Sequence, residues 1–316
     1  MALVLAVVSL ALGTSVRSAQ LDPRAMCASQ VSAGPFPKEM LDPLRAPVRL
    51  PRPPMRIASK ALVADELLEA VVPVERIAAL TNLIDDESVT VLAGRVPASV
   101  RRTGGGVEEL LALAPDLVVV AEFTEGAATA QLVSAGAPVL RLAVADGFEA
   151  VRVALRSVGA ATGCEERAGR VIDDLDARIA AVRSRSKGRL ASRVLFLMGG
   201  RYGAGEGTIV DEAIDAAGGL NVARELGVRG VAPIAVEQIV ATQPDVVLVS
   251  ASTERVRPAT EADLDPSVPW RVLEAMRGGR VFAVPSTWFG SISHQAVRAV
   301  EAVDEILAAL PSERAR

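Results

Sequence analysis

Apolar residues in the middle of the chain recur with the spacing of one face of an α-helix. The longest such pattern runs from Thr162 to Lys187, with apolar positions at Ala168, Val171, Ile172, Leu175, Ile179 and Val182. Charged residues fill the positions between them, and Thr162 followed by Glu165 has the form of a capping box, which predicts where the helix begins. At 1.5 Å per residue such a helix spans roughly 30 Å, about the width of a small domain. We therefore predict one long helix that joins two lobes.

Short runs of Val, Leu and Ile lie on both sides of this helix and are separated from one another by helical patterns. Unbroken apolar runs indicate strands that are covered on both faces, as in a parallel sheet. The predicted strands are 56–59, 76–80, 117–121 and 139–142 before the long helix, and 193–198, 246–250 and 281–284 after it. The other predicted helices are 63–72, 107–114, 127–135, 148–158, 209–217, 236–242, 270–276 and 293–310. The predicted fold class is α/β, with two Rossmann-like lobes of mainly parallel sheet joined by one long α-helix.

The two lobes share a sequence motif. A Glu, six residues, Pro-Asp and four apolar residues occur at 108–120 and again at 237–249. Because these segments occupy corresponding places on the two sides of the long helix, they indicate two related lobes. A chain of 316 residues is long enough to give each lobe its own core.

The first 54 residues differ in composition from the rest. An apolar run of signal-peptide length, followed by small residues, predicts a signal peptide over 1–19 and export to the periplasm, although no Lys or Arg precedes the run. Residues 20–54 are rich in proline and without apolar periodicity, which predicts an extended lead-in. We expect the ordered protein to begin near Met55, with an N-terminal lobe over 55–145, connecting helices over 146–187 and a C-terminal lobe over 188–316.

Composition excludes several function classes. The formal net charge of −4 provides no basic surface for nucleic acid. The only histidine, His294, is predicted at the solvated start of a helix, and one histidine cannot form the several-histidine site of a bare zinc or manganese binder. The glycine-rich segment 199–208 matches neither a dinucleotide-binding nor a P-loop pattern. Cys27 and Cys164 allow at most one disulfide, and whether they pair stays open.

A resemblance to a known family rests on several of these segments. They are the repeated Glu-x6-Pro-Asp unit, the opening 56–59 with Glu66 and Leu68, the long helix, and the stretches 205–222 and 278–284. Together they resemble the periplasmic substrate-binding proteins of ABC importers for cobalamin, haem and ferric siderophores, over about residues 56–310. The resemblance implies a ligand held in a cleft between the lobes. It also implies that Glu108 and Glu237, one in each lobe, pair with arginines of a permease dimer. Residues 59–66 depart from the family's Ser-Leu-x-Pro-x-x-Thr-Glu pattern in a loop that borders the cleft.

Candidate ligand-binding residues follow the predicted strands, because ligands of open α/β sheets bind outside the carboxyl ends of the strands. These candidates are Ser59, Lys60, Asn82 and Phe123 in the first lobe, and Arg201, Tyr202, Trp288 and Phe289 in the second. Tyr202 is the only tyrosine, and Trp288 has ordinary packing as its alternative role.

The predicted function is capture of a metal chelate (ferric siderophore, haem or cobalamin) and its delivery to a permease, by a monomer without a cofactor or a metal of its own. The alternatives are a sensor or scavenger of the same fold that works without a transporter, and an α/β enzyme that uses the cleft. No catalytic constellation supports the enzyme.

Overall fold

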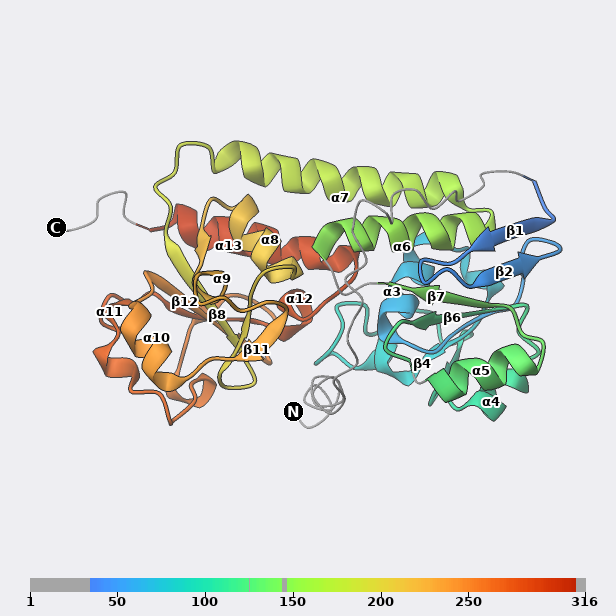
Figure 1. Cartoon of the computed structure of the whole chain (residues 1–316), viewed down its shortest axis with the longest axis horizontal. Helices are drawn as coiled ribbons and strands as arrows, with labels where there is room; N and C mark the ends of the chain where they lie inside the picture. Colours follow the sequence, from blue (N-terminus) through green and yellow to red (C-terminus); the bar gives the residue numbers. More distant parts are fainter. Residues whose placement is uncertain (1–34, 125, 144–146, 311–316) are drawn as a thin grey trace.

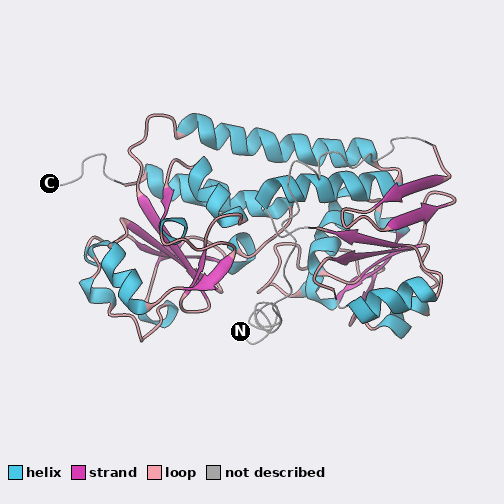
Figure 2. Ribbon diagram, viewed as in Figure 1, coloured by secondary structure: helices cyan, strands magenta, loops and turns pink. Residues whose placement is uncertain are grey.

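The computed structural model describes residues 35–124, 126–143 and 147–310. They form two α/β lobes with a layer of long helices along one side (Figures 1 and 2). The predicted α/β fold class is confirmed. The predicted signal peptide over 1–19 and Cys27 lie outside the described residues.

The N-terminal lobe is built on a five-stranded sheet that is parallel throughout, in the order β5-β4-β3-β6-β7. Its strands are β3 (Ile57–Ser59), β4 (Ile77–Thr81), β5 (Arg101–Thr103), β6 (Leu117–Ala121) and β7 (Val139–Leu142). Its helices are α3 (Leu62–Val71), α4 (Val107–Leu111), α5 (Gly126–Ser134) and α6 (Gly147–Thr162), with short 3-10 turns η1 (Val74–Arg76) and η2 (Asn82–Asp85). Every residue of β6 is buried, as its unbroken apolar run predicts.

The C-terminal lobe has a seven-stranded mixed sheet in the order β11-β9-β8-β12-β14-β13, with β10 beside β8. Its parallel centre is β8 (Arg193–Met198), β12 (Val246–Ala251) and β14 (Val281–Pro285). The smaller strands are β9 (Tyr202–Ala204), β10 (Leu220–Asn221), β11 (Val231–Pro233) and β13 (Arg257–Pro258). The helices are α8 (Ile209–Ala216), α9 (Val222–Glu225), α10 (Val236–Thr242), α11 (Glu274–Arg277), α12 (Ser286–Phe289) and α13 (Val297–Ala308), with 3-10 turns η3 (Glu261–Asp263), η4 (Trp270–Val272) and η5 (His294–Ala296). The helix predicted over 270–276 is instead the turn η4 followed by the single turn α11.

The internal repeat extends to individual hydrogen bonds. In the N-terminal lobe, the Asp116 carboxylate accepts from the backbone N–H of Arg56 at 2.7 Å, and the Arg56 guanidinium donates to the Leu113 carbonyl at 2.6 Å. In the C-terminal lobe, Asp245 accepts from the backbone N–H of Arg193 at 2.8 Å, and Arg193 donates to the carbonyl of Thr242. Each Pro-Asp unit therefore fixes the start of the neighbouring strand in the same way.

The backbone before the two Pro-Asp units repeats as well. Ala114 and Gln243 both have left-handed conformations, with φ of 44° and 41°. Non-glycine residues rarely adopt this region. The same uncommon turn at equivalent positions supports two related lobes.

The predicted long helix that joins the lobes is confirmed, and α6 of the N-terminal lobe packs beside it. The longer helix, α7 (Glu165–Arg185), runs along both lobes (Figure 1) and contacts α3 and α6 of the N-terminal lobe and α8 and α13 of the C-terminal lobe. Its buried residues lie on the predicted face: Ala168, Ile172, Leu175, Ile179 and Val182. None of the helices in the described ranges is both long enough and apolar enough to cross a membrane.

The predicted helix start at Thr162 is wrong. Thr162 is the last residue of α6, and its hydroxyl donates to the Val158 carbonyl at 2.7 Å, one turn back in the same helix. The turn between the helices lies at Gly163, with φ of 70°, and Cys164 precedes α7 without a side-chain cap. A Thr can bond backward to its own helix as well as cap the next one, so the Thr-x-x-Glu pattern alone does not decide between them.

A single apolar core runs through both lobes. It receives alternate residues from the central strands of both sheets, such as Val119 of β6 and Leu248 of β12, together with residues of α3, α6, α7, α8 and α13. We call it the shared core. The opposite face of each sheet has a smaller core of its own: Val118 and Val120 pack beneath α4 and α5, and Val247 and Val249 pack with residues of α9 and α10.

The prediction that residues 20–54 are an extended lead-in is wrong for its described part. Strands β1 (Lys38–Leu41) and β2 (Pro47–Leu50) form an antiparallel hairpin whose inward residues Met40, Val48 and Leu50 join the shared core. Lys38 is buried, and its ammonium group donates to the Ala160 carbonyl at 3.0 Å and contacts Glu165 at 2.5 Å. Buried and exposed residues alternate on each strand, but in β1 the buried positions are Lys38 and Met40, so its sequence carries no polar–apolar alternation that would predict a strand.

Candidate functional site

The carboxyl ends of the parallel strands lie at one edge of each sheet, and the loops that follow these ends approach each other between the lobes. Ser286 directly follows β14, and Ser88 lies in the segment after β4 and η2. The Ser286 hydroxyl donates to the Ser88 carbonyl across the lobes at 3.2 Å. A ligand at this junction would therefore be reached by loops of both lobes.

Three candidates of the N-terminal lobe lie on these loops. The Lys60 ammonium group donates to the Gly105 carbonyl, which links the loop after β3 to the loop after β5. Asn82 is exposed at the start of η2. Phe123, which follows β6, leaves 52% of its surface in water, which is unusual for a large apolar residue. Of these three, Phe123 is the side chain most available to an apolar ligand.

Three candidates of the C-terminal lobe follow β8 and β14. Arg201 is partly exposed, and its guanidinium lies 3.6 Å from the Asp265 carboxylate. Tyr202 opens β9 and is half-buried, and its hydroxyl has no hydrogen-bond partner among the described residues. Trp288 is half-buried in α12 and packs against the shared core. Partly exposed aromatic and guanidinium groups suit a large ligand that carries both apolar and anionic parts.

Two candidates are buried and do not reach this surface. Ser59 is 0% exposed, and its hydroxyl exchanges hydrogen bonds with the backbone of Ala61. Phe289 is 3% exposed and stacks on Phe196 of β8, with ring centroids 5.3 Å apart. The first residue of a loop after a strand can point into the core as readily as out of it. The assignment of these two residues to ligand binding is therefore corrected to packing.

The expectation that His294 is solvated is wrong. His294 lies at the start of η5 and is half-buried, and its Nδ1 is shielded from water and has no hydrogen-bond partner among the described residues. Burial, with help from the nearby Arg178 guanidinium, lowers its pKa to about 4. The imidazole is therefore neutral at pH 7. Within the described ranges, no group of three or more His, Cys, Asp or Glu side chains is arranged to hold a metal ion.

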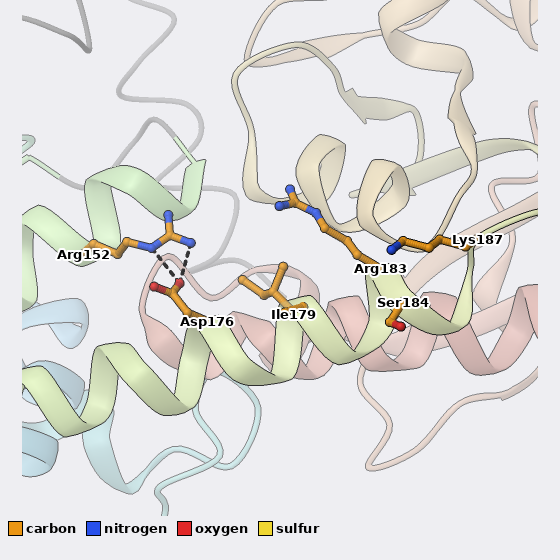
Figure 3. A pocket seen from close by; sticks show the side chains of 7 residues that line it. Arg152, Asp176, Ile179, Arg183, Ser184 and Lys187 are labelled. Carbon is orange, nitrogen blue, oxygen red and sulfur yellow. Dashed lines mark hydrogen bonds and ion pairs between the residues drawn. The ribbon is translucent and has the colours of Figure 1, made fainter.

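Two surface hollows lie away from the candidate ligand residues. One, of about 430 Å³, is lined by Arg152 of α6 and by residues of α7 and the turn after it (Figure 3), where Arg152 is paired with Asp176 at 2.6 Å. The other, of about 470 Å³, lies in the N-terminal lobe and includes Glu69, Arg95 and Arg167. None of the eight candidates lines either hollow.

The two glutamates of the repeat occupy equivalent surface positions. Glu108 lies in the first turn of α4, and Glu237 lies in the first turn of α10. Both are exposed, and neither side chain forms an ion pair or hydrogen bond among the described residues. In Figure 1, α4 and α10 lie on the side of the molecule opposite α7, one in each lobe. The neighbouring Glu109 differs, because its carboxylate accepts from the backbone N–H of Gly104 at 3.0 Å.

The sequence interpretation missed a pair of adjacent buried acids in α3, Asp65 and Glu66, of which Glu66 contacts the other lobe. They are 0% and 3% exposed, and their hydrogen-bond partners are hydroxyl and backbone groups. Burial raises the pKa of Asp65 to about 7 and also raises the pKa of Glu66. Nothing in the local sequence marks Glu66 as buried.

Sequence comparisons identify relatives of this chain. The profile of a family described as periplasmic binding protein matches residues 64–287. A cobalamin-binding protein of Halobacterium salinarum is 29% identical over 215 residues, which make up 67% of this chain and 56% of that protein. The chain thus spans little more than half the length of this curated relative.

Solved structures with the same fold include three proteins from bacteria. The periplasmic haem-binding protein RhuT of Roseiflexus in apo form superposes with a TM-score of 0.63 at 24% identity, covering 80% of this chain and 98% of that one. The vitamin B12 binding protein BtuF of Vibrio cholerae superposes with a TM-score of 0.63 at 19% identity, covering 81% and 97%. A structure of an ABC-type Fe3+-hydroxamate transport system from Saccharomonospora viridis gives 0.62 at 20% identity, covering 87% and 100%. At these identities the likeness concerns the fold alone.

Proposed function

We propose that this chain, which belongs to the periplasmic binding protein family, captures a metal chelate between its lobes outside the cytoplasm and delivers it to the permease of an ABC importer. The family and the curated relative are binding proteins, so this chain is classed as a binding protein and not as an enzyme. The chelate, the export and the permease are the proposed parts. Cobalamin is the first chelate to test because the curated relative is named for it, and haem and a ferric hydroxamate follow from the structural relatives.

The observation that carries the proposal is the equivalent placement of Glu108 and Glu237. Two unpaired carboxylates, one on each lobe and both on the side away from α7, suit a partner that presents two matching cations. A two-fold permease would present such a pair. Complementary charges of this kind steer association and fix register more than they add affinity. The alternative role of each Glu is to favour the start of its own helix, which contributes about 0.3–1 kcal/mol.

The docking test replaces these carboxylates by isosteric amides. Glu108→Gln and Glu237→Gln should leave chelate binding and thermal stability near wild type and should lower chelate-dependent ATPase activity of a reconstituted transporter, most in the double variant. The matched controls are Glu166→Gln of α7 and Glu305→Gln of α13, exposed glutamates on helices of the other side. Normal transport by a Glu108/Glu109/Glu237 triple variant would contradict docking through this pair.

The ligand test titrates the purified protein with cyanocobalamin, haemin and a ferric hydroxamate siderophore. Binding is followed through the fluorescence of Trp288, which is half-buried near the junction, with Trp270 as a buried second reporter. Tyr202→Ala should weaken binding of the preferred chelate while the melting temperature stays near wild type. With haemin the phenol could also act as an iron ligand, which a shift in the haem absorption bands would report. Leu190→Ala, at an exposed site after α7, is the control. If none of the three chelates binds, the proposed ligand class is wrong.

A further inference from the structure

The carboxyl group of Glu66 forms a buried polar contact between the lobes that the proposed function does not use. Its Oε1 accepts a hydrogen bond from the Thr90 hydroxyl of the same lobe at 2.7 Å. Its Oε2 accepts from the hydroxyls of Ser293 and Ser291, the latter at 3.3 Å, and both serines lie between α12 and α13 of the other lobe. The three hydroxyls surround one carboxyl group that is 3% exposed.

Among the residues that the structure describes, no cation forms an ion pair with this carboxyl group. The charged neighbours that face it come from its own helix, and both are acids: Asp65, which is bonded to Thr81, and Glu69, which faces Arg95 and Arg167. The segment after η2 contributes Thr90, and the segment before η5 contributes only serines. His294, the next residue, is turned toward Arg178, Asp174 and Arg298. Burial removes the hydration of a carboxylate, and hydroxyl donors without a nearby cation replace that hydration only in part.

The lobes also meet elsewhere. Between the loops, the Ser286 hydroxyl donates to the Ser88 carbonyl at 3.2 Å. In the helix layer, the shared core continues from one lobe into the other, and α7 contacts both lobes. The carboxylate of Glu212 in α8 accepts from the backbone N–H of Phe148 at the start of α6 at 3.1 Å. The shared core, α7 and Glu212 hold the helix layer together. The contact of Glu66 joins α3 to the segment before η5, and both α3 and η5 also contact α7. A change in the angle between the lobes would move α3 against this segment and would stretch the contact.

We propose that Glu66, Ser291 and Ser293 form a proton-sensitive latch that holds the two lobes at one angle. Glu66 acts as a positioning residue, because its hydrogen bonds to the two serines hold the C-terminal lobe in place against the N-terminal lobe. The direction of the pH effect on the latch follows from the hydration of the Glu66 carboxyl group. In the latched arrangement burial raises the pKa of Glu66 above its ordinary value of 4.5, whereas separation of the lobes returns the carboxyl group to water and lowers its pKa again. Protonation therefore favours the latched arrangement, and ionisation favours separation.

The latch is tested by measuring the distance between the lobes in the ligand-free protein, so the result does not depend on the proposed chelate or permease. Spin labels are attached at Gln131→Cys in α5 and Arg277→Cys in α11, two exposed positions in opposite lobes, after Cys27 and Cys164 are replaced by Ser. As pH rises from 5 to 8, the distance distribution of wild type should broaden and shift. Glu66→Gln, an isostere that cannot ionise, should keep the narrow low-pH distribution at every pH.

Three further variants separate the latch from other effects. Ser291→Ala removes one hydrogen bond across the lobes and should broaden the distribution even at pH 5. Thr90→Val removes a hydrogen bond to the same carboxyl group within one lobe and should keep the pH response. Asp65→Asn removes the neighbouring titration and should also keep it. The latch is overturned if the wild-type distance does not change with pH, or if Asp65→Asn abolishes the change and Glu66→Gln does not. Should Ser291→Ala fail to fold, the comparison of Glu66→Gln with Asp65→Asn still decides the matter.

Discussion

Asp65 should make the protein less stable as pH rises from 4 to 7. Its carboxyl group is 0% exposed, and the Thr81 backbone N–H and hydroxyl and the Ser59 hydroxyl only partly replace water. Burial raises its pKa from 3.8 to about 7. The folded state therefore binds a proton that the unfolded state has released, so the stabilisation is complete below about pH 4 and is lost as pH rises through 7. At 1.36 kcal/mol per pKa unit, the shift corresponds to about 4 kcal/mol of unfolding free energy.

Urea unfolding of Asp65→Asn and wild type at pH 4, 5, 6, 7 and 8, followed by tryptophan fluorescence, measures this effect. An asparagine keeps the size and can still bond to Thr81, but it does not titrate. The unfolding free energy of wild type should fall by about 1.4 kcal/mol per pH unit across this window, and the variant should not show this fall. The stability of the variant relative to wild type should therefore increase with pH. The control Asp86→Asn removes an exposed acid whose pKa is lowered by the Ser88 hydroxyl, so it should not change the slope in this window. Parallel curves for Asp65→Asn and wild type between pH 4 and 7 would refute the reasoning.

Two further substitutions test the packing between elements. Phe289→Ala should lower the unfolding free energy by about 3–5 kcal/mol, because it leaves a cavity beside Phe196. Phe123→Ala, at an exposed phenylalanine, should change stability little. Equal losses would contradict the burial assigned to Phe289. Gly147→Ala should destabilise more than Gly94→Ala when both are compared by thermal unfolding. Both glycines have φ near 73°, but a Cβ at position 147 would lie 2.0 Å from the Glu212 carboxylate, whereas a Cβ at position 94 would meet nothing within 4 Å. Equal losses of stability would mean that the Glu212 side chain moves aside freely.

Strands with continuous apolar runs could be predicted closely from the sequence. The predicted bounds of β6, β7 and β8 coincide with those in the structure, because strands covered on both faces need apolar residues at every position. Strands β9, β11 and β13 were missed. They contain two or three residues each, and they exist only because a neighbouring strand offers unpaired backbone groups, which no local pattern records.

The candidate site could be predicted less well than the fold. Position after a strand selects exposed residues such as Phe123 and equally Ser59 and Phe289, which are buried. Whether such a side chain points outward depends on what packs above it, and that is set by distant parts of the chain. Glu66 illustrates the same limit, since a Glu in a helix normally faces water, and its burial depends on serines more than 220 positions away.

The shared core has a consequence for how the two halves of this chain relate as evolutionary units. Their matching Pro-Asp turns are what a duplicated ancestral segment would leave behind. Each half covers the core-facing side of its sheet with its own helices, since α3 and α6 contact β6 and β7 in the first half and α12 contacts β12 in the second. What the halves share is α7, which packs on α3 and α6 of the first half and on α8 and α13 of the second. A cut between the halves would leave one of them without α7 and would expose the helix faces that α7 now covers, so the two halves cannot be exchanged as independent modules.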